Sequence, residues 1–338
     1  MITFAIPTWN RAEKLKRCVE SIVVQSPAQV VICDDASNDE TQKVCAALAK
    51  KYPCVKYLRF EDRQNFAGNY KRAVLAAEQE YVWTFGDDDL LMEGALSFMV
   101  NNIKNTQFDF YHASESIRTA KAEAMCGTVL EICNAIGWLD FTGFISCNIG
   151  RTSLMQAGVS SAQWPVYAKS SFPQSLAILE IMAGRSAMMM EIGVVESSKL
   201  GDDDTAKRWA ENSICWNYLY VADGLKHLVE VGTVPPKVPE TFFRYITESL
   251  FNRLMRDFNG REVLDPGAVT AADWACLHYL ADMVSEERGN KLATWVRAVH
   301  AKIQEESHNF KASVDAYARL TVVMNTIEMP TFSHSYLP

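Results

Sequence analysis

The sequence predicts an α/β fold, an open and mostly parallel sheet flanked by helices, followed by an all-α C-terminal domain. Two observations predict the sheet: short apolar runs recur through residues 1–112, and segments with helical spacing separate them. This alternation favours parallel strands joined by right-handed crossovers. A third observation predicts the second domain, because from about Asp204 onward the apolar residues keep helical spacing. We therefore expect two domains, residues 1–200 and 201–338, with a boundary near Leu200–Gly201.

The N-terminal elements follow one another as strand and helix. The predicted strands are Ile2–Ile6, Val30–Cys33, Val55–Phe60, Tyr81–Phe85 and Phe108–Tyr111. The predicted helices are Arg11–Val24, a helix capped by Ser37 or Asn38 and ending near Lys51, then Phe66–Ala77 and Leu96–Ile103. In the C-terminal domain, apolar stripes at helical spacing run through residues 214–228, 243–254 and 292–303. Turn-forming residues separate these stripes, at Val234–Pro236, Asp265–Gly267 and Arg288–Asn290.

Composition and charge exclude several classes of protein. The chain has 338 residues and a formal net charge of -8, which argues against a nucleic-acid-binding protein. None of its nine cysteines forms a Cys-x-x-Cys pair and its six histidines are scattered, which argues against a disulfide framework and a zinc site. No signal peptide is recognisable at the N-terminus, and no apolar run reaches the roughly 18 residues of a membrane span. We expect a cytoplasmic protein.

Polar clusters follow three of the predicted strands where each strand ends. They are Thr8–Asn10, Asp34–Asp35 and Gly86–Asp89. In an open parallel sheet, ligands bind beyond the carboxyl ends of the strands, so we expect these clusters to form one site. No Gly-x-Gly-x-x-Gly follows the first strand and no Gly-x-x-x-x-Gly-Lys occurs, which disfavours a dinucleotide dehydrogenase and a P-loop enzyme.

The acidic triplet Asp87, Asp88 and Asp89 is the sharpest of these clusters. Three adjacent carboxylates repel one another at the end of an apolar strand unless a cation compensates them, and oxygen ligands suit Mg²⁺ or Mn²⁺. The alternative is a solvated loop with Asp89 near a helix start. The same four letters recur at Gly201–Asp204, where they open a predicted helix, so capping is the simpler interpretation there and a mobile loop that contacts nucleotide or acceptor is the other.

Two residues are candidates for binding a nucleotide base. The Asp35 carboxylate can accept a hydrogen bond from the N3–H of uracil or thymine, or from the amino group of cytosine. Trp9 could stack on the same base. The alternatives are turn formation with Ser37 for Asp35 and strand-end packing for Trp9. Arg11 either pairs with phosphate or belongs to the solvated first turn of a helix. His112, at the end of the fifth strand, is expected to be a buried and hydrogen-bonded histidine, with contact to an acceptor as the alternative.

Several motifs together resemble family 2 glycosyltransferases, which have the nucleotide-sugar-binding fold called GT-A. The similar segments are Ile6–Arg11, Asp34–Asp39, Asn65-x-x-Gly68-Asn69 with Arg72–Ala73, and Tyr81–Asp89, and they agree with the family in order and spacing over roughly residues 1–112. The Gly-Asp-Asp-Asp form resembles the abequosyltransferase-like branch, whose members build bacterial surface polysaccharide. Phe144–Arg151 resembles a later strand of the family that faces the acceptor.

The resemblance implies a role for each candidate position. Pro7, Thr8 and Trp9 would line base and ribose, and Asp35 would read the base. Asp87, Asp88 and Asp89 would be the metal motif, the family's Asp-x-Asp, with Asp88 or Asp89 as the direct ligand and both counted as catalytic. Arg11 would contact the donor. Asn65, with Lys71 or Arg72, would hold phosphate or ribose, or would lie on a helix surface.

One departure from the family concerns the base that deprotonates the acceptor. Where many members carry Glu-Asp, this chain has Phe172–Leu176, and Gln174 has no titratable group. Glu180 is expected on a solvated face. Another carboxylate then serves (Glu191, Glu196 or one of Asp202–Asp204), or the base is dispensable. Inversion or retention at the anomeric carbon stays open.

These observations predict a hexosyl- or deoxyhexosyl-transferase. It would move a sugar from a nucleotide-diphosphate donor, of a pyrimidine by preference, with Mn²⁺ or Mg²⁺, to a hydroxyl of a bacterial surface polysaccharide or lipid-linked glycan. Such an acceptor would place it at the inner face of the cell membrane. The helical domain would supply acceptor contacts, membrane approach or homo-oligomerisation. The alternatives are a sugar-phosphate nucleotidyltransferase, which normally has a Gly-rich basic loop that Pro7–Asn10 lacks, and a non-catalytic nucleotide- or glycan-binding module, suggested by Gln174.

Overall fold

The computed structural model forms two compact units, Met1–Ala206 and Lys207–Pro338. It describes residues 1–25, 28–113, 124–190, 193–196, 214–235, 255–258 and 261–264, together with 278, 294, 297–298 and 300–301. The predicted boundary near Leu200–Gly201 lies outside the described residues and stays a prediction. Among the described residues, no helix is both long and apolar enough to cross a membrane.

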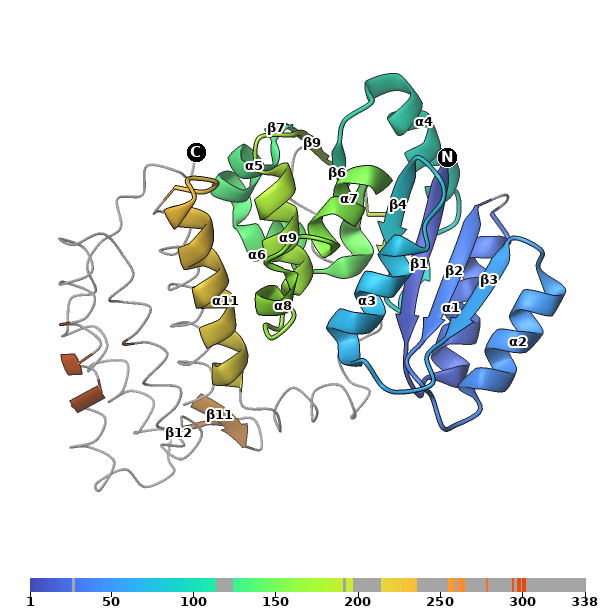
Figure 1. The fold of residues 1–338 in the computed structure, drawn as a ribbon, viewed down its shortest axis with the longest axis horizontal. Helices are drawn as coiled ribbons and strands as arrows, with labels where there is room; N and C mark the ends of the chain where they lie inside the picture. The colour runs from blue at the N-terminus through green and yellow to red at the C-terminus, as the bar shows by residue number, and fades with distance from the viewer. Residues whose placement is uncertain are drawn as a thin grey trace. The chain divides into compact units, whose positions relative to one another are not determined.

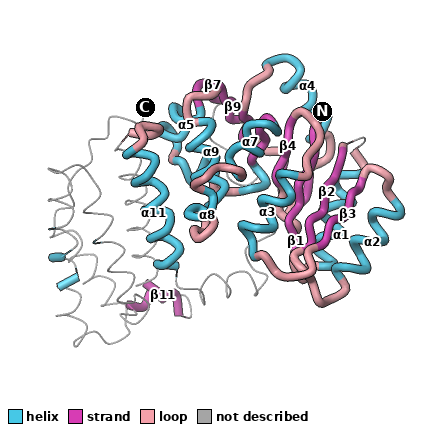
Figure 2. The backbone as a smooth tube through the Cα atoms, viewed as in Figure 1, coloured by secondary structure: helices cyan, strands magenta, loops and turns pink. Residues whose placement is uncertain are grey.

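The first unit is built on an eight-stranded sheet in the order β3-β2-β1-β4-β8-β6-β9-β7. These strands are β1 Ile2–Thr8, β2 Gln29–Asp34, β3 Val55–Arg59, β4 Tyr81–Thr84, β6 Phe110–His112, β7 Met125–Thr128, β8 Asn148–Arg151 and β9 Ser186–Met189. Figures 1 and 2 show β3, β2, β1 and β4 side by side. The pairs β3–β2, β2–β1, β1–β4 and β6–β9 are parallel, whereas β8 and β7 pair antiparallel with their neighbours. The prediction of an open, mostly parallel sheet is confirmed.

Each of the five predicted N-terminal strands is present, with ends that differ by one or two residues. Helices connect them, namely α1 Ala12–Val23, α2 Thr41–Lys51, α3 Asn65–Leu75 and α4 Ala95–Thr106. A short antiparallel pair, β5 Leu90–Leu91 and β10 Val195–Glu196, lies apart from the main sheet. The predicted cap of α2 was wrong. That helix begins at Thr41, whose N–H donates to the Asp39 carboxylate at 2.9 Å, and the Ser37 hydroxyl instead accepts the Asn10 N–H at 2.9 Å.

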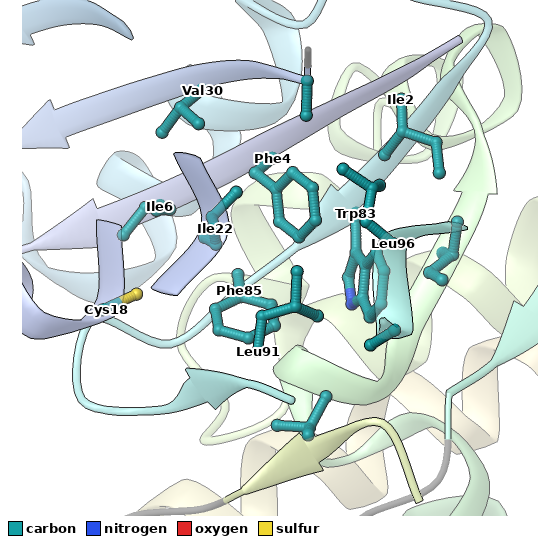
Figure 3. Close-up of a cluster of buried hydrophobic side chains, with 14 of the residues drawn as sticks. Ile2, Phe4, Ile6, Cys18, Ile22, Val30, Trp83, Phe85, Leu91 and Leu96 are labelled. Carbon is teal, nitrogen blue, oxygen red and sulfur yellow. The ribbon is translucent and has the colours of Figure 1, made fainter. Parts of the chain in front are cut away.

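An aromatic cluster fills one face of the sheet directly below the carboxyl ends of β1 and β4 (Figure 3). The rings of Phe4 and Trp83 stack at 4.9 Å between centroids, and Phe85 meets both rings edge-on. The buried side of α1, including Cys18 and Ile22, packs on this cluster. Trp83 also donates its indole N–H to the Ser146 carbonyl at 2.8 Å. This packing gives the loop after β4 a rigid floor.

A second layer of helices covers the other face of the sheet. Its elements are α3, α5 Val129–Ile136, α6 Trp138–Thr142, α7 Thr152–Val159, α8 Trp164–Tyr167 and α9 Pro173–Met182. The 3₁₀ turn η1 Ile145–Cys147 lies between α6 and β8 in the chain. Phe110 points to this face, because it alternates with Tyr111 along β6, and its ring packs on Phe141 at 5.3 Å. A Cβ on Gly158 of α7 would come within 3.2 Å of the Ala177 carbonyl of α9, so the glycine permits these two helices to pack closely.

The second unit contains α11 Ile214–Glu230 and an antiparallel hairpin of β11 Met255–Phe258 and β12 Arg261–Leu264. Along α11, Val221, Leu225 and Leu228 are buried at helical spacing, as predicted. The hairpin corrects the expectation that this part of the chain is all-α. Its signal was Asn259–Gly260, a pair that is typical of tight hairpin turns. The other predicted helical stripes, 243–254 and 292–303, lie largely outside the described residues.

Candidate active site

The carboxyl ends of β1, β2 and β4 meet at one edge of the sheet, as the positions of the polar clusters predicted. The Asp35 N–H donates to the Thr8 carbonyl at 3.0 Å, and the Thr8 hydroxyl donates to the Asp87 carboxylate at 2.7 Å. The Asn69 amide of α3 ties two strand ends together by donating to the carbonyls of Thr8 and Cys33 at 3.1 and 2.9 Å. Side chains that are far apart in the sequence therefore form one site.

Three residues at this edge adopt left-handed backbone conformations without being glycine. Asn10 has φ of 53°, Ala36 of 57° and Asn65 of 60°. Such conformations cost about 1 kcal/mol or more each and persist where surrounding contacts impose them, often at functional sites. Two hydrogen bonds between Asn10 and Asn38 impose part of this geometry. The Asn10 side-chain amide donates to Asn38 Oδ1 at 2.9 Å, and the Asn38 backbone N–H donates to Asn10 Oδ1 at 2.9 Å.

The three acids of the loop after β4 have different partners. Asp87 is 7% exposed and accepts hydrogen bonds from Thr8 and, at 3.3 Å, from Arg11. Burial raises the pKa of Asp87 to about 6, although the charge of Arg11 opposes this effect. Asp88 Oδ2 accepts a hydrogen bond from Arg11 Nη1 at 2.5 Å. Asp89 is 3% exposed and accepts the hydroxyl hydrogen of Ser146.

Ser146 fixes this loop to the neighbouring turn η1. Its hydroxyl oxygen accepts the Gly86 N–H at 2.7 Å while it donates to Asp89. A Cβ on Gly86 would come within 2.6 Å of Asp89 and 3.1 Å of the Ser146 hydroxyl, so this position requires a glycine. Of the two acids expected as the direct metal ligand, Asp89 is therefore turned inward and Asp88 remains at the surface of the loop.

The loop fits a divalent ion only as a partial site. Among the residues that the structure describes, no group of three or more His, Cys, Asp or Glu side chains could hold a metal by itself. Mg²⁺ and Mn²⁺, however, are often bound by one or two carboxylates together with substrate phosphates. Asp88, with Asp87 behind it, offers that donor set.

A second cluster surrounds Trp9 and consists of Asp35, Arg63 and Gln64. Asp35 is 2% exposed and accepts the Gln64 N–H at 2.5 Å. Burial raises the pKa of Asp35, against the effects of this hydrogen bond and of Arg63. The Arg63 guanidinium lies 3.5 Å above the Trp9 ring, and its Nε is 3.8 Å from the Asp35 carboxylate. Arg63 was not predicted from the sequence. Its signal was a basic residue two positions before the Asn65 motif, after a strand that ends at this edge.

The remaining predicted donor residues lie around these clusters. Pro7 and Thr8 are the buried last residues of β1. Asn65 is the first residue of α3. The Arg72 guanidinium lies 4.0 Å from the centre of the Phe60 ring, a packing contact at the helix surface. Their roles toward a donor stay predictions.

Gln174 is one of three buried side chains that form hydrogen bonds to carbonyls at the end of α6. Its amide donates to the Gly143 carbonyl at 2.9 Å, Asn148 donates to the Thr142 carbonyl at 2.8 Å, and His112 Nδ1 lies 2.7 Å from the Phe141 carbonyl. Three buried side chains thus hold three successive carbonyls at the end of α6. A carbonyl only accepts, so Nδ1 of His112 carries the hydrogen, and the expectation of a buried, hydrogen-bonded histidine is confirmed.

The other acids considered as a base are placed as follows. Glu180 is half-buried and accepts a hydrogen bond from Ser161 at 2.7 Å, so the expectation of a solvated face was wrong. Glu196 is exposed on β10. Glu191 and Asp202–Asp204 lie outside the described residues.

Comparisons with known proteins identify this architecture. The fold is the GT-A type: a crystal structure of S. aureus TarS 1-349 in complex with UDP-GlcNAc superposes with a TM-score of 0.64 at 17% identity, covering 97% of this chain and 90% of that one. Residues 3–116 match the family model described as "Glycosyl transferase family 2", which confirms the resemblance found in the sequence for this N-terminal segment.

Two curated relatives match part of this chain. The GalNAc(5)-diNAcBac-PP-undecaprenol beta-1,3-glucosyltransferase of Campylobacter jejuni is 31% identical over 102 residues, which are 29% of this chain and 33% of the relative. Abequosyltransferase RfbV of Salmonella typhimurium is 31% identical over 117 residues, 33% of this chain and 34% of the relative. The matched segment spans about a third of the length of these relatives.

Proposed function

We propose that this protein is a glycosyltransferase that moves a sugar from a nucleotide-diphosphate donor to a hydroxyl of a bacterial surface polysaccharide or lipid-linked glycan. The observation that carries this proposal is the pairing of two clusters at one sheet edge. Trp9 and Asp35 offer a stacking surface and a buried acceptor for a base, and the acidic loop with Arg11 offers charges for a diphosphate. The family match and the two relatives, whose names specify glycosyl transfer, support it.

The chemistry around Trp9 favours a uridine or thymidine donor. Uracil and thymine present an N3–H donor flanked by two carbonyl acceptors. Asp35 supplies an acceptor for N3–H, and Arg63 supplies donors for a neighbouring carbonyl. The base would take the place of the Arg63 guanidinium on the face of Trp9, since flat cations and bases both stack on aromatic rings. The UDP-GlcNAc complex of the similar TarS structure is consistent with this assignment.

Asp88 is the residue that we assign to a divalent ion, with Asp87 behind it. Mn²⁺ or Mg²⁺ held there by Asp88 and the diphosphate oxygens would stabilise the negative charge on the departing nucleoside diphosphate. Asp89 acts structurally in this assignment, because Ser146 holds its carboxylate inward. Gln174 does not take the proton of the acceptor hydroxyl, because an amide has no basic site near neutral pH and its N–H is bonded to Gly143.

A lipid-linked acceptor would place this cytoplasmic protein at the inner face of the cell membrane. The name of the Campylobacter relative, which includes an undecaprenol-linked glycan, supports that part of the proposal. Acceptor contacts, membrane approach and homo-oligomerisation remain the candidate roles of the C-terminal unit.

The test is a calorimetric panel of uridine, thymidine, cytidine, adenosine and guanosine diphosphates with and without Mn²⁺. We expect the uridine or thymidine compound to bind best and to need Mn²⁺. At a hundred times its dissociation constant, such a ligand adds about 2.7 kcal/mol to the free energy of unfolding, which a thermal-shift measurement detects. Asp88→Asn should lose the Mn²⁺ requirement together with affinity. Asp62→Asn, a change at an exposed acid near the same edge, is the matched control. Preference for a purine, or equal binding by the Asp88 variant, would contradict the assignment.

A further inference from the structure

Arg11 forms ion pairs with the acidic loop in this structure. Its guanidinium bridges two carboxylates, with Nη1 at 2.5 Å from Asp88 Oδ2 and 3.3 Å from Asp87 Oδ1. Its backbone is fixed, because its N–H donates to the Thr41 hydroxyl at 2.9 Å and its carbonyl accepts the Leu15 N–H at 2.9 Å. The side chain is 22% exposed and reaches the acids from the start of α1. A long side chain on a fixed backbone can exchange one partner for another without moving the fold.

The loop does not need this ion pair as an anchor. Thr8 holds Asp87, Ser146 holds both Gly86 and Asp89, and these three contacts fix the loop at both ends. The guanidinium therefore acts on the charges of Asp87 and Asp88 rather than on the path of the backbone. These are the same two acids that the proposed function assigns to a divalent ion.

A guanidinium and a divalent ion cannot occupy this position together. Metal–oxygen distances of about 2.0–2.2 Å would bring the ion to the carboxylate oxygens that Arg11 contacts, and the two cations would repel each other. A sugar-nucleotide diphosphate carries two negative charges and UDP about three near neutral pH, so the complex of either with a divalent ion has no net positive charge. Such a complex can enter between the guanidinium and the carboxylates without adding positive charge to the site, whereas the free metal adds two positive charges beside Arg11.

We propose that Arg11 is an exchangeable counter-ion and a positioning residue that couples the metal to the donor. It neutralises Asp87 and Asp88 until the metal–diphosphate complex binds, and its guanidinium then moves to the diphosphate oxygens, which it can contact in bidentate fashion. The site consequently takes metal and nucleotide together and binds free metal weakly. This inference rests on the proposed function, because it requires a nucleoside diphosphate and a divalent ion at the acidic loop.

The experiment measures Mn²⁺ binding to the full chain by the loss of the free-ion signal in electron paramagnetic resonance, with and without UDP. Wild-type protein should bind Mn²⁺ about ten- to a hundredfold more tightly when UDP is present, a coupling of ordinary size between two ligands. Arg11→Gln should bind Mn²⁺ without UDP about tenfold more tightly than wild type, and the gain from UDP should fall toward onefold. Arg11→Lys keeps the charge but not the fork of donors, so its Mn²⁺ affinity and its gain from UDP should lie between those of wild type and Arg11→Gln. This variant keeps the inference testable if the Gln variant folds poorly.

Arg17→Gln removes the same charge from an exposed position of α1 and should behave as wild type. Two outcomes overturn the inference in different ways. If wild type binds UDP with Mn²⁺ but Arg11→Gln keeps the wild-type coupling, or binds free Mn²⁺ no better, then Arg11 is a permanent ion pair and the inference alone is wrong. If wild type binds no UDP at any Mn²⁺ concentration, the proposed function is wrong and the inference fails with it.

Discussion

Asp87 gives a prediction whose size follows from its burial. Replacing it with Asn keeps the shape of the side chain and an oxygen that can accept from Thr8, but removes the charge. In the folded protein, burial raises the pKa of Asp87 from 3.8 to about 6. Asp87→Asn should therefore change how the stability of the first unit depends on pH, measured without metal.

The sign and magnitude follow from linkage. A carboxyl whose pKa is higher in the folded state stabilises the fold at low pH, and this contribution is lost as the pH rises through the folded value. The difference between the unfolded and folded pKa values corresponds to about 3 kcal/mol, at about 1.4 kcal/mol for each tenfold change in proton affinity. Between pH 5 and pH 7.5, wild type should lose about 1.4 kcal/mol of stability relative to Asp87→Asn, because the unfolded chain is already ionised at pH 5 and the folded chain is not.

Hydrogen exchange of the β1 and β4 amides, in the presence of a metal chelator, measures the opening free energy of this part of the sheet. Comparing the two proteins at each pH cancels the intrinsic exchange rate. Asp62→Asn, at an exposed position, should show no pH-dependent difference from wild type. A wild-type-minus-variant difference that stays constant from pH 5 to 7.5 would refute the reasoning, since it would mean that Asp87 titrates alike in the folded and unfolded states.

Three further predictions concern single side chains. Trp9→Ala should weaken UDP binding by about 1–3 kcal/mol in calorimetry, and an unchanged affinity would return Trp9 to a packing role. Asp35→Ala should change the order of preference among uridine, thymidine and cytidine diphosphates, and an unaltered order would remove it from base recognition. His112→Ala should cost about 1–3 kcal/mol in urea unfolding because the Phe141 carbonyl loses its donor, whereas His112→Asn, whose amide can replace Nδ1–H, should cost clearly less; equal losses would contradict the hydrogen-bond argument.

The sequence predicts the sheet well because its central strands carry strong, local signals. The run Tyr81–Phe85 is almost wholly apolar, as expected for a strand buried on both faces between others. The acids and turn residues that end β1, β2 and β4 are equally local, so their gathering at one edge follows from the parallel topology alone. The hairpin at 255–264 was missed because the whole region after about Asp204 was assigned to helices, and the local turn signal Asn259–Gly260 was not weighed.

Which acid of a triplet faces solvent cannot be predicted from its own neighbours. Asp87, Asp88 and Asp89 look alike in the sequence, and Ser146, which turns Asp89 inward, lies 57 residues further along the chain. The contact of Arg63 with Trp9 depends in the same way on how a loop folds back over the sheet. Local pattern therefore predicts where charge gathers, and tertiary contacts decide what each charge does.

Gln174 shows how a missing group can be explained by what replaces it. Compared with the family pattern, the sequence shows only the loss of a carboxylate. In the structure, the end of α6 presents the carbonyls of residues 141–143 to three side chains, and all three, His112, Asn148 and Gln174, can donate a hydrogen bond. An ionised Asp or Glu cannot donate, so at position 174 it would leave the Gly143 carbonyl without its partner and place a negative charge beside it. The glutamine is thus the residue type that this arrangement of carbonyls requires, and any proton transfer from the acceptor has to be assigned to another group.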